Sequence, residues 1–231
     1  MYRVRRETVS HIVNISKVVA PEMFIGVLLP VFKKLCTDQI WGVRRQAVEV
    51  LPEMCMLAPD DVKNGPLLDI FKKFTKDSSK WVKQAATQYL GPFIVCYKGL
   101  EPSPVLLEFY SNMVKENASV GLKSGAGISN AQASEDVLYH CAFNFPAVLV
   151  TLGPKMWPQL KPIYEKLVRD SRVKVRRTLS YSLFELAKIL GPDLTETELI
   201  SILFHFLKDV DEVKEGVLEN LPLFIEQLTE V

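Results

Sequence analysis

The chain has 231 residues, of which 48% are hydrophobic and 24% are charged, and its formal net charge is +1. Such a composition is typical of a folded protein, and the near-zero charge argues against any general attraction to nucleic acid or to anionic membranes. The longest apolar stretches are far short of the roughly 20 residues that span a bilayer. We therefore expect no membrane and no nucleic-acid partner. The charged N-terminus is also unlike a secretory signal.

One ten-residue segment recurs at a fixed distance along the chain. Residues 38–47 align without a gap with residues 77–86, which lie 39 residues later, and Asp, Val and Ala keep their places. A third copy at residues 170–177 again has Val five and Arg six residues after Asp. A period of this size indicates stacked structural repeats rather than one globular core.

Apolar residues recur at helical spacing throughout the chain, and no strand-like alternation is present. An opening helix around residues 4–19 lacks a first-helix partner, so we expect the chain to begin inside a repeat, as a truncated form or fragment would. The helix pairs that we expect after it cover residues 24–36 with 43–58, 66–75 with 81–96, 105–114 with a helix from 137, 156–169 with 173–190, and 195–209 with 213–228.

Residues 115–134 interrupt this pattern. They are rich in Gly, Ser, Ala and Asn and poor in large apolar residues, a composition that cannot bury enough surface to order itself. The second helices before and after it begin 55 residues apart, where the other spacings are 38 or 39. We therefore predict N-terminal repeats over residues 1–114, a flexible insertion over 115–134, and C-terminal repeats of the same array over 135–231.

Paired helices with this period, a proline within the first helix and Val-Arg shortly after Asp resemble the HEAT repeat. The predicted fold is thus all-α, a HEAT-repeat α-solenoid built as a curved stack of antiparallel helix pairs. In stacked repeats, the Asp of one turn can pair with the Arg or Lys of a neighbouring repeat. The ladder expected from this arrangement consists of Asp38, Arg44, Asp77, Lys83, Asp170, Arg176, Asp209 and Lys214.

More specifically, the chain resembles the HEAT-repeat regulatory subunit 1 family of serine/threonine-protein phosphatase 4, which is related to the phosphatase 2A scaffold subunit. Residues 81–94, 141–146, 174–179 and 206–213 carry the resemblance. In that family a long polar, acidic insertion separates the repeats, whereas residues 115–134 are short and not acidic.

The resemblance implies a non-catalytic scaffold in the cytoplasm, with the nucleus as a second location. It would bind a catalytic subunit of the phosphatase 4 or 2A type and direct it to phosphoprotein substrates. The alternative is a HEAT or armadillo adaptor for nuclear transport or for chromosome-associated assemblies.

Catalytic and metal-binding patterns are not found in the sequence. The three histidines, at 11, 140 and 205, form no His-Glu-x-x-His motif, and the four widely spaced cysteines form no Cys-x-x-Cys. Gly121, Gly125 and Gly127 have no Gly-Lys-Ser/Thr after them and no strand before them, so they do not predict a phosphate site. We expect reduced, buried cysteines, no metal, no cofactor and no enzymatic activity.

Two tryptophans occupy the turns within repeats. Trp41 and Trp81 each precede the Val that opens a second helix. Each could pack over the turn of the next repeat, or contact a partner, because Trp and Arg are enriched at interface hot spots. The Phe-Lys-Lys motifs at 32–34 and 71–73 we expect to supply solvated faces. By the resemblance, the candidate partner-binding residues are Trp41, Lys80, Trp81, Arg172, Lys174 and Glu212.

Overall fold

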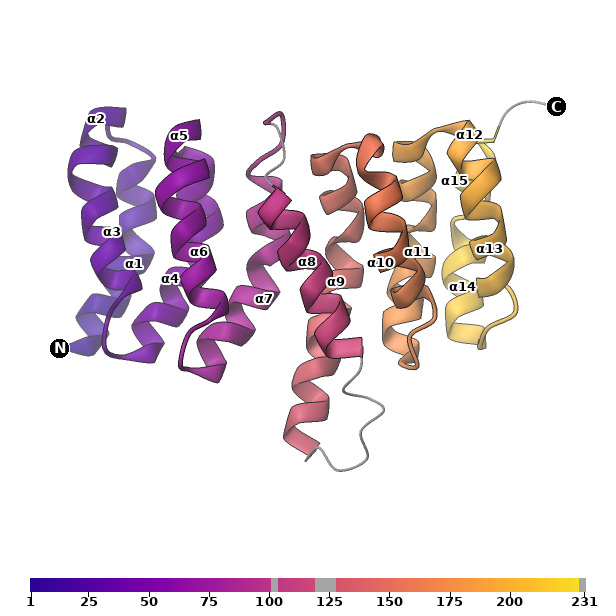
Figure 1. Cartoon of the computed structure of the whole chain (residues 1–231), viewed down its shortest axis with the longest axis horizontal. Coiled ribbons are helices and arrows are strands. Elements are labelled where there is room, and N and C mark those ends of the chain that lie inside the picture. Colours follow the sequence, from indigo (N-terminus) through magenta and orange to yellow (C-terminus); the bar gives the residue numbers. More distant parts are fainter. Residues whose placement is uncertain (101–103, 119–127, 229–231) are drawn as a thin grey trace. The chain divides into compact units, whose positions relative to one another are not determined.

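The computed structural model describes residues 1–100, 104–118 and 128–228, with side chains outside 116–118 and 128–136. Every regular element in these ranges is a helix, which confirms the all-α, helical-repeat prediction (Figure 1). The chain divides into two compact units, Met1–Ser103 (unit 1) and Pro104–Val231 (unit 2).

Unit 1 is built from helix pairs whose second helices pack side by side. The second helices are α1 (Tyr2–Ser16), α4 (Trp41–Leu57) and α7 (Lys80–Val95), and α4 packs against both of the others. Each first helix has three segments, and the last of them packs on the second helix that follows. These segments are α2 (Pro21–Met23), η1 (Phe24–Leu28) and α3 (Leu29–Cys36) in one repeat, and α5 (Asp60–Val62), η2 (Lys63–Leu67) and α6 (Leu68–Thr75) in the next.

The middle segment of both first helices is a π-helical turn next to a proline. Pro30 follows η1, and Pro66 lies inside η2. Proline has no N–H and its ring clashes with the carbonyl four residues earlier, whereas a π turn moves the hydrogen bond to the fifth residue back. Accordingly, the N–H of Leu29 donates to the carbonyl of Phe24. The π turn therefore accommodates the proline predicted within the first helix.

The core of unit 1 lies between the two helices of each repeat. On α4, Val43, Ala47 and Leu51 are fully buried at the three-to-four spacing expected for one apolar face. Phe71 on α6 stacks on Phe93 of α7 with ring centroids 4.5 Å apart and an interplanar angle of 7°. Burial of such side chains contributes roughly 1.5–3 kcal/mol each.

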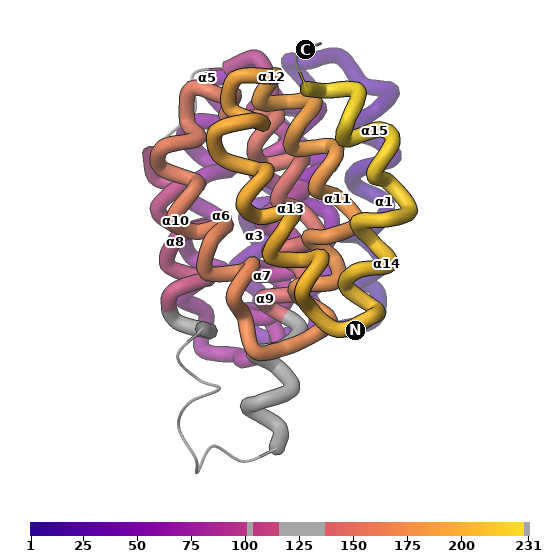
Figure 2. The backbone as a smooth tube through the Cα atoms, turned by 90° about the vertical axis from the view of Figure 1, so that its right-hand side faces the viewer, coloured from indigo at the N-terminus to yellow at the C-terminus, as the bar shows by residue number. Residues whose placement is uncertain are grey.

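Unit 2 continues the same plan of paired helices. Its second helices are α9 (Ile128–Leu152), α11 (Val173–Leu190) and α14 (Asp211–Glu219), and α11 packs against both of the others. Figure 2 shows α13 and α14 lying side by side and joined by a short turn. The remaining helical segments are α8 (Pro104–Ala118), η4 (Pro154–Met156), α10 (Trp157–Val168), α12 (Pro192–Leu194), η5 (Thr195–Leu199), α13 (Ile200–Phe206) and α15 (Leu221–Ile225).

The segment predicted as an insertion is partly helical. Helix α8 continues to Ala118 and α9 begins at Ile128, while residues 119–127 lie outside the described residues. Ala, Gln and Glu in residues 131–135 favour helix, and extending a helix that is already formed costs little. Because α8 packs on α9, it belongs to unit 2, which begins at Pro104.

Aromatic side chains fill the core of unit 2. Tyr110, Phe145, Tyr164 and Trp157 form a chain of ring contacts with centroids 4.8–6.1 Å apart. The hydroxyl of Tyr110 donates to the carbonyl of Cys141 at 2.5 Å, which explains how a fully buried phenol is tolerated there. Among the described residues, the buried Trp157 indole N–H and the buried Tyr164 hydroxyl find no hydrogen-bond partner.

The cysteines and the apolar helices also bear on function. All four cysteines are buried free thiols, and burial raises the pKa of Cys141 to about 12, so its thiol is a poor nucleophile.

Within the described ranges, no single helix is long and apolar enough to cross a bilayer. One consecutive pair, Val137–Leu152 with Pro154–Val168, passes that test only jointly, and it is bent by 114°.

Candidate functional site

The turn that joins the two helices of a repeat is organised by its aspartate. The Asp38 carboxylate accepts the N–H of Ile40 at 2.9 Å, and the Asp77 carboxylate accepts the N–H of Ser79 at 2.7 Å. Asp and Asn favour turns because their side chains bond to nearby backbone N–H groups in this way. The aspartate thus shapes the turn just before the second helix begins.

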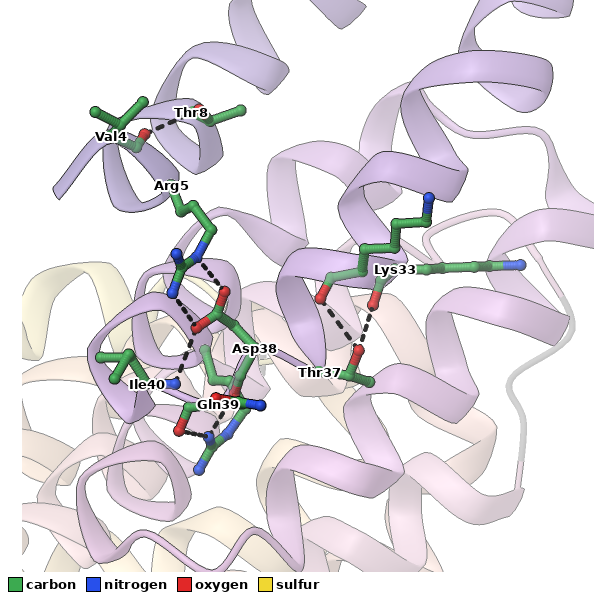
Figure 3. Close-up of polar contacts among 10 residues, drawn as sticks. Val4, Arg5, Thr8, Lys33, Thr37, Asp38, Gln39 and Ile40 are labelled. Carbon is green, nitrogen blue, oxygen red and sulfur yellow. Dashed lines mark hydrogen bonds and ion pairs between the residues drawn. The ribbon is translucent and has the colours of Figure 1, made fainter. Parts of the chain in front are cut away.

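An arginine from the preceding second helix reaches each of these carboxylates. Arg44 donates to both Asp77 oxygens at 2.7 and 2.8 Å, and its third nitrogen donates to the Asp38 carbonyl at 2.7 Å. Arg5 donates two hydrogen bonds, of 2.6 and 3.1 Å, to the Asp38 carboxylate (Figure 3). Each pair joins residues 33 positions apart, so it links one repeat to the next.

The same arrangement recurs in unit 2. Arg176 donates to both Asp209 oxygens at 2.6 and 2.8 Å, and to the Asp170 carbonyl at 2.6 Å. Paired donors of this kind are the strong form of the ion pair, because the planar guanidinium matches both carboxylate oxygens. We call these three pairs, Arg5–Asp38, Arg44–Asp77 and Arg176–Asp209, the aspartate–arginine ladder.

The ladder lowers the pKa of its three carboxyl groups. Hydrogen bonds from Arg5 and from Arg176 are the main cause at Asp38 and Asp209. At Asp77 burial acts to raise the pKa, but the Arg44 hydrogen bond and the Ser79 N–H outweigh it, so the pKa is again below its usual value. All three side chains therefore carry a negative charge at neutral pH.

Three residues of the predicted ladder have other surroundings. Asp170 pairs with Arg172 of its own turn at 2.7 Å, because the residue 33 positions earlier is Val137, which has no donor. Lys214 pairs with Asp211 of its own helix at 3.0 Å. Lys83 makes no ion pair with a described residue, and the position 33 residues after it has no described side chain. Asp170 and Lys214 thus pair within their own turn or helix and not between repeats, while the ladder partner expected for Lys83 lies outside the described side chains.

The two turn tryptophans of unit 1 lie against each other. Trp41, in the first turn of α4, stacks on Trp81 of α7 with ring centroids 6.3 Å apart and an angle of 29°. Both side chains nevertheless stay 45% exposed, and the Lys80 ammonium lies 4.9 Å from the centre of the Trp81 ring. Each tryptophan thus packs on a neighbouring turn and also presents a face to solvent. We call Trp41, Lys80 and Trp81 the tryptophan surface.

The other predicted partner-binding residues belong to unit 2. The Arg172 guanidinium forms an ion pair with Asp170, so its positive charge is already partnered. The Lys174 ammonium lies 4.1 Å above the Tyr139 ring, a cation–π contact between α11 and α9, while Glu212 is exposed at the start of α14. Sequence reasoning did not single out Tyr139, because its contact depends on how the two helices pack.

A second feature of unit 1 is a groove between α3 and α6. It encloses about 730 Å³ and is bordered by the turns that carry Asp38 and Asp77. Its size lies within the range of ligand pockets, roughly 300–1,000 Å³. Lys33 and Lys73, from the two Phe-Lys-Lys motifs, both line it, so these lysines are not only part of solvated faces as predicted. Nowhere in the described ranges do three or more metal-ligating side chains gather.

The family model that matches this chain covers residues of unit 2. Residues 141–231 match the family model described as "Protein phosphatase 4 regulatory subunit 1 middle domain". The resemblance to phosphatase 4 regulatory subunit 1 is confirmed. The human protein of that name is 46% identical over 101 residues, as is the mouse one, and mouse phosphatase 4 regulatory subunit 4 is 29% identical over 137 residues.

The matches cover only part of each protein. The alignment with human regulatory subunit 1 covers 43% of this chain and 11% of the human protein, and the alignment with mouse regulatory subunit 4 covers 53% and 15%. All these relatives are named regulatory subunits, in agreement with the prediction of a non-catalytic chain. The family match includes Arg172, Lys174 and Glu212 as well as the Arg176–Asp209 pair.

Proposed function

We propose that the chain acts as a non-catalytic regulatory subunit of a phosphatase 4-type serine/threonine phosphatase. It would hold the catalytic subunit and direct it to phosphoprotein substrates. The observation that carries this proposal is the match of residues 141–231 to the regulatory subunit 1 middle domain. A scaffold needs no catalytic group of its own, because tethering alone raises the concentration of substrate near the bound enzyme.

We further propose that the tryptophan surface contributes to docking of the catalytic subunit. Tryptophan is the residue type most enriched at interface hot spots, and both rings leave nearly half of their surface open to solvent. Stacking of the two rings restricts their rotamers before binding, so less side-chain entropy is lost on association. Lys80 adds a positive charge beside the rings, which favours an acidic patch on the partner.

The test is direct binding of the full chain to purified catalytic subunits of phosphatases 4, 2A and 6, measured by surface plasmon resonance. We expect selective binding of the phosphatase 4 subunit. Replacing both tryptophans of the tryptophan surface by alanine should weaken that binding by about thirtyfold, the loss of one strong hot spot. Met56→Ala is the matched control, because Met56 is 67% exposed near the opposite end of α4.

The possible outcomes separate the two proposals. Binding of none of the three catalytic subunits would overturn the regulatory role for this chain. Binding that survives the double tryptophan substitution would keep that role and reject the tryptophan surface as the docking site. Hydrolysis of a phosphopeptide by the purified chain alone would contradict its non-catalytic nature.

A further inference from the structure

The groove between α3 and α6 is lined by two lysines that take no part in the ladder. Three carboxylates lie along it, and each has a partner: Asp38 pairs with Arg5, Asp77 with Arg44, and Asp69 with Lys72 at 3.4 Å. Two further cations, Lys33 and Lys73, also line the groove. Both are exposed, and neither makes an ion pair with a described residue.

The repeat itself brings these two lysines to the same groove. Lys33 lies in the last turn of α3, and Lys73 lies in the last turn of α6. The helix C-terminus favours a cation in the last turn, but this weak effect leaves the ammonium free to bind a carboxylate. A groove with two unpaired ammonium groups is complementary to a ligand with separated negative charges.

The floor of the groove is apolar, and its rim offers unused polar groups. Cys36, Ile70 and Phe74 line the floor and are 7%, 6% and 1% exposed. Gln39 and Ser78, which occupy the same position in consecutive repeats, lie on the rim, and their side chains make no hydrogen bond to another described residue. An amide and a hydroxyl placed in this way can bond to the backbone of an extended peptide.

We propose that the groove between α3 and α6 binds an extended acidic segment of a partner protein. Its carboxylates pair with Lys33 and Lys73, and its apolar side chains contact Ile70 and Phe74. Alternating acidic and apolar residues suit this geometry, because successive side chains of an extended chain point to opposite sides. The groove does not include the tryptophan surface, so this proposal is independent of where a catalytic subunit docks.

Other anionic ligands fit the groove less well. A nucleic acid presents a continuous row of phosphates, which would meet the carboxylates of Asp38, Asp69 and Asp77 as well as the lysines. Single-stranded binding sites also stack bases on exposed aromatic rings, whereas the one aromatic residue of the groove, Phe74, is buried. Isolated carboxylates on a peptide avoid both conflicts.

The experiment uses the purified full chain without any phosphatase. A fluorescein-labelled nine-residue peptide that alternates Glu with Leu is titrated by fluorescence anisotropy at low and at physiological salt. The comparison probes are the same peptide with Gln for Glu, and a single-stranded RNA of equal length. We expect the Glu peptide to bind, with weakening at higher salt, and the Gln peptide to bind at least about tenfold more weakly.

Two double variants locate the site. Lys33→Glu with Lys73→Glu should weaken binding of the Glu peptide by about tenfold or more, because attraction becomes repulsion. Lys34→Glu with Lys76→Glu makes the same change in net charge at neighbouring residues that do not line the groove, and it should alter affinity by less than about twofold. All four lysines are exposed, so both variants should fold, which circular dichroism checks.

Any of the following outcomes would overturn the proposal that the groove binds an acidic peptide. Failure of the wild-type chain to bind the Glu peptide, or an unchanged affinity in the groove variant, would refute it directly. An equal loss in both variants would show a diffuse surface potential rather than a site. Tighter binding of the RNA than of the Glu peptide would replace the peptide by a nucleic acid.

Discussion

The Arg44–Asp77 pair allows a sharp test of what the ladder contributes to stability. The perturbation is Arg44→Met, which keeps most of the aliphatic stem and removes the guanidinium. The wild-type side chains are 13% and 10% exposed, and Arg44 donates four hydrogen bonds, three of 2.7–2.8 Å and one of 3.2 Å to the Gln39 carbonyl. After the substitution, the Asp77 carboxylate keeps only the N–H of Ser79 and stays largely shielded from water.

The expected loss follows from this burial. Exposed ion pairs contribute about 0–1 kcal/mol, whereas removing one partner of a fully buried pair costs about 3–5 kcal/mol. The Arg44–Asp77 pair lies between these limits, and hydrogen bonds to charged groups contribute about 1.5–3 kcal/mol net. We therefore expect Arg44→Met to lower the free energy of unfolding by about 2–3 kcal/mol.

The assay is urea unfolding of the full chain, followed by tryptophan fluorescence and by circular dichroism. The variants are Arg44→Met, Asp77→Asn and their combination, so that a double-mutant cycle isolates the coupling of the pair. The control is Arg45→Met, because Arg45 pairs with Glu49 of its own helix and is 46% exposed. That control should lose only about 0.3–0.5 kcal/mol.

A clear result would refute this reasoning. If Arg44→Met costs no more than Arg45→Met, or if the cycle shows no coupling between Arg44 and Asp77, the ladder does not stabilise the stack.

Three further predictions use the same unfolding assay. Gly216→Ala should cost about 1–3 kcal/mol, since its Cβ would lie 2.5 Å from the Tyr181 ring, whereas Gly42→Ala, with nothing within 4 Å, should cost nothing. Phe93→Ala, at a fully buried position, should cost about 3–5 kcal/mol, and a loss below 1 kcal/mol would contradict the stacked core. The three ladder carboxyl groups have lowered pKa values, so they stabilise the fold fully when the pH is above their usual pKa of 3.8. This stabilisation is lost as the pH falls through their pKa values in the folded state. The Arg44→Met chain should therefore lose less stability between about pH 5 and pH 2 than the wild type does.

The fold and part of the site could be predicted because the repeat shows itself in the spacing of apolar, Asp and Arg residues along the sequence. Val43, Ala47 and Leu51 recur at helical spacing, and that pattern alone predicts which face of α4 is buried. The recurrence of Asp and Arg at fixed offsets likewise predicted ion pairs between neighbouring repeats, and Arg44–Asp77 is one such pair.

The remaining features depend on contacts that local spacing does not contain. The partner of Asp170 was mispredicted because the donor position of the preceding repeat holds Val137, a substitution that matters only once the two turns are stacked. The lysines of the groove looked like ordinary solvated residues, since a cavity arises from the space between helices and not from one helix. The helical ends of residues 115–134 were missed because a glycine- and serine-rich composition was averaged over the whole segment.

The ladder also bears on how such arrays can change by duplication. Where two repeats meet, the aspartate belongs to one repeat and the arginine belongs to the repeat before it. Arg44, for example, donates to the Asp38 carbonyl in the turn of its own repeat and to the Asp77 carboxylate in the turn of the next repeat. A copied 39-residue module therefore brings along an acceptor for its predecessor and a donor for its successor, so it can be inserted without any compensating substitution. Among the described residues, Val137 occupies a position where such an insertion would not find a ready-made donor, and Lys174 contacts the Tyr139 ring nearby.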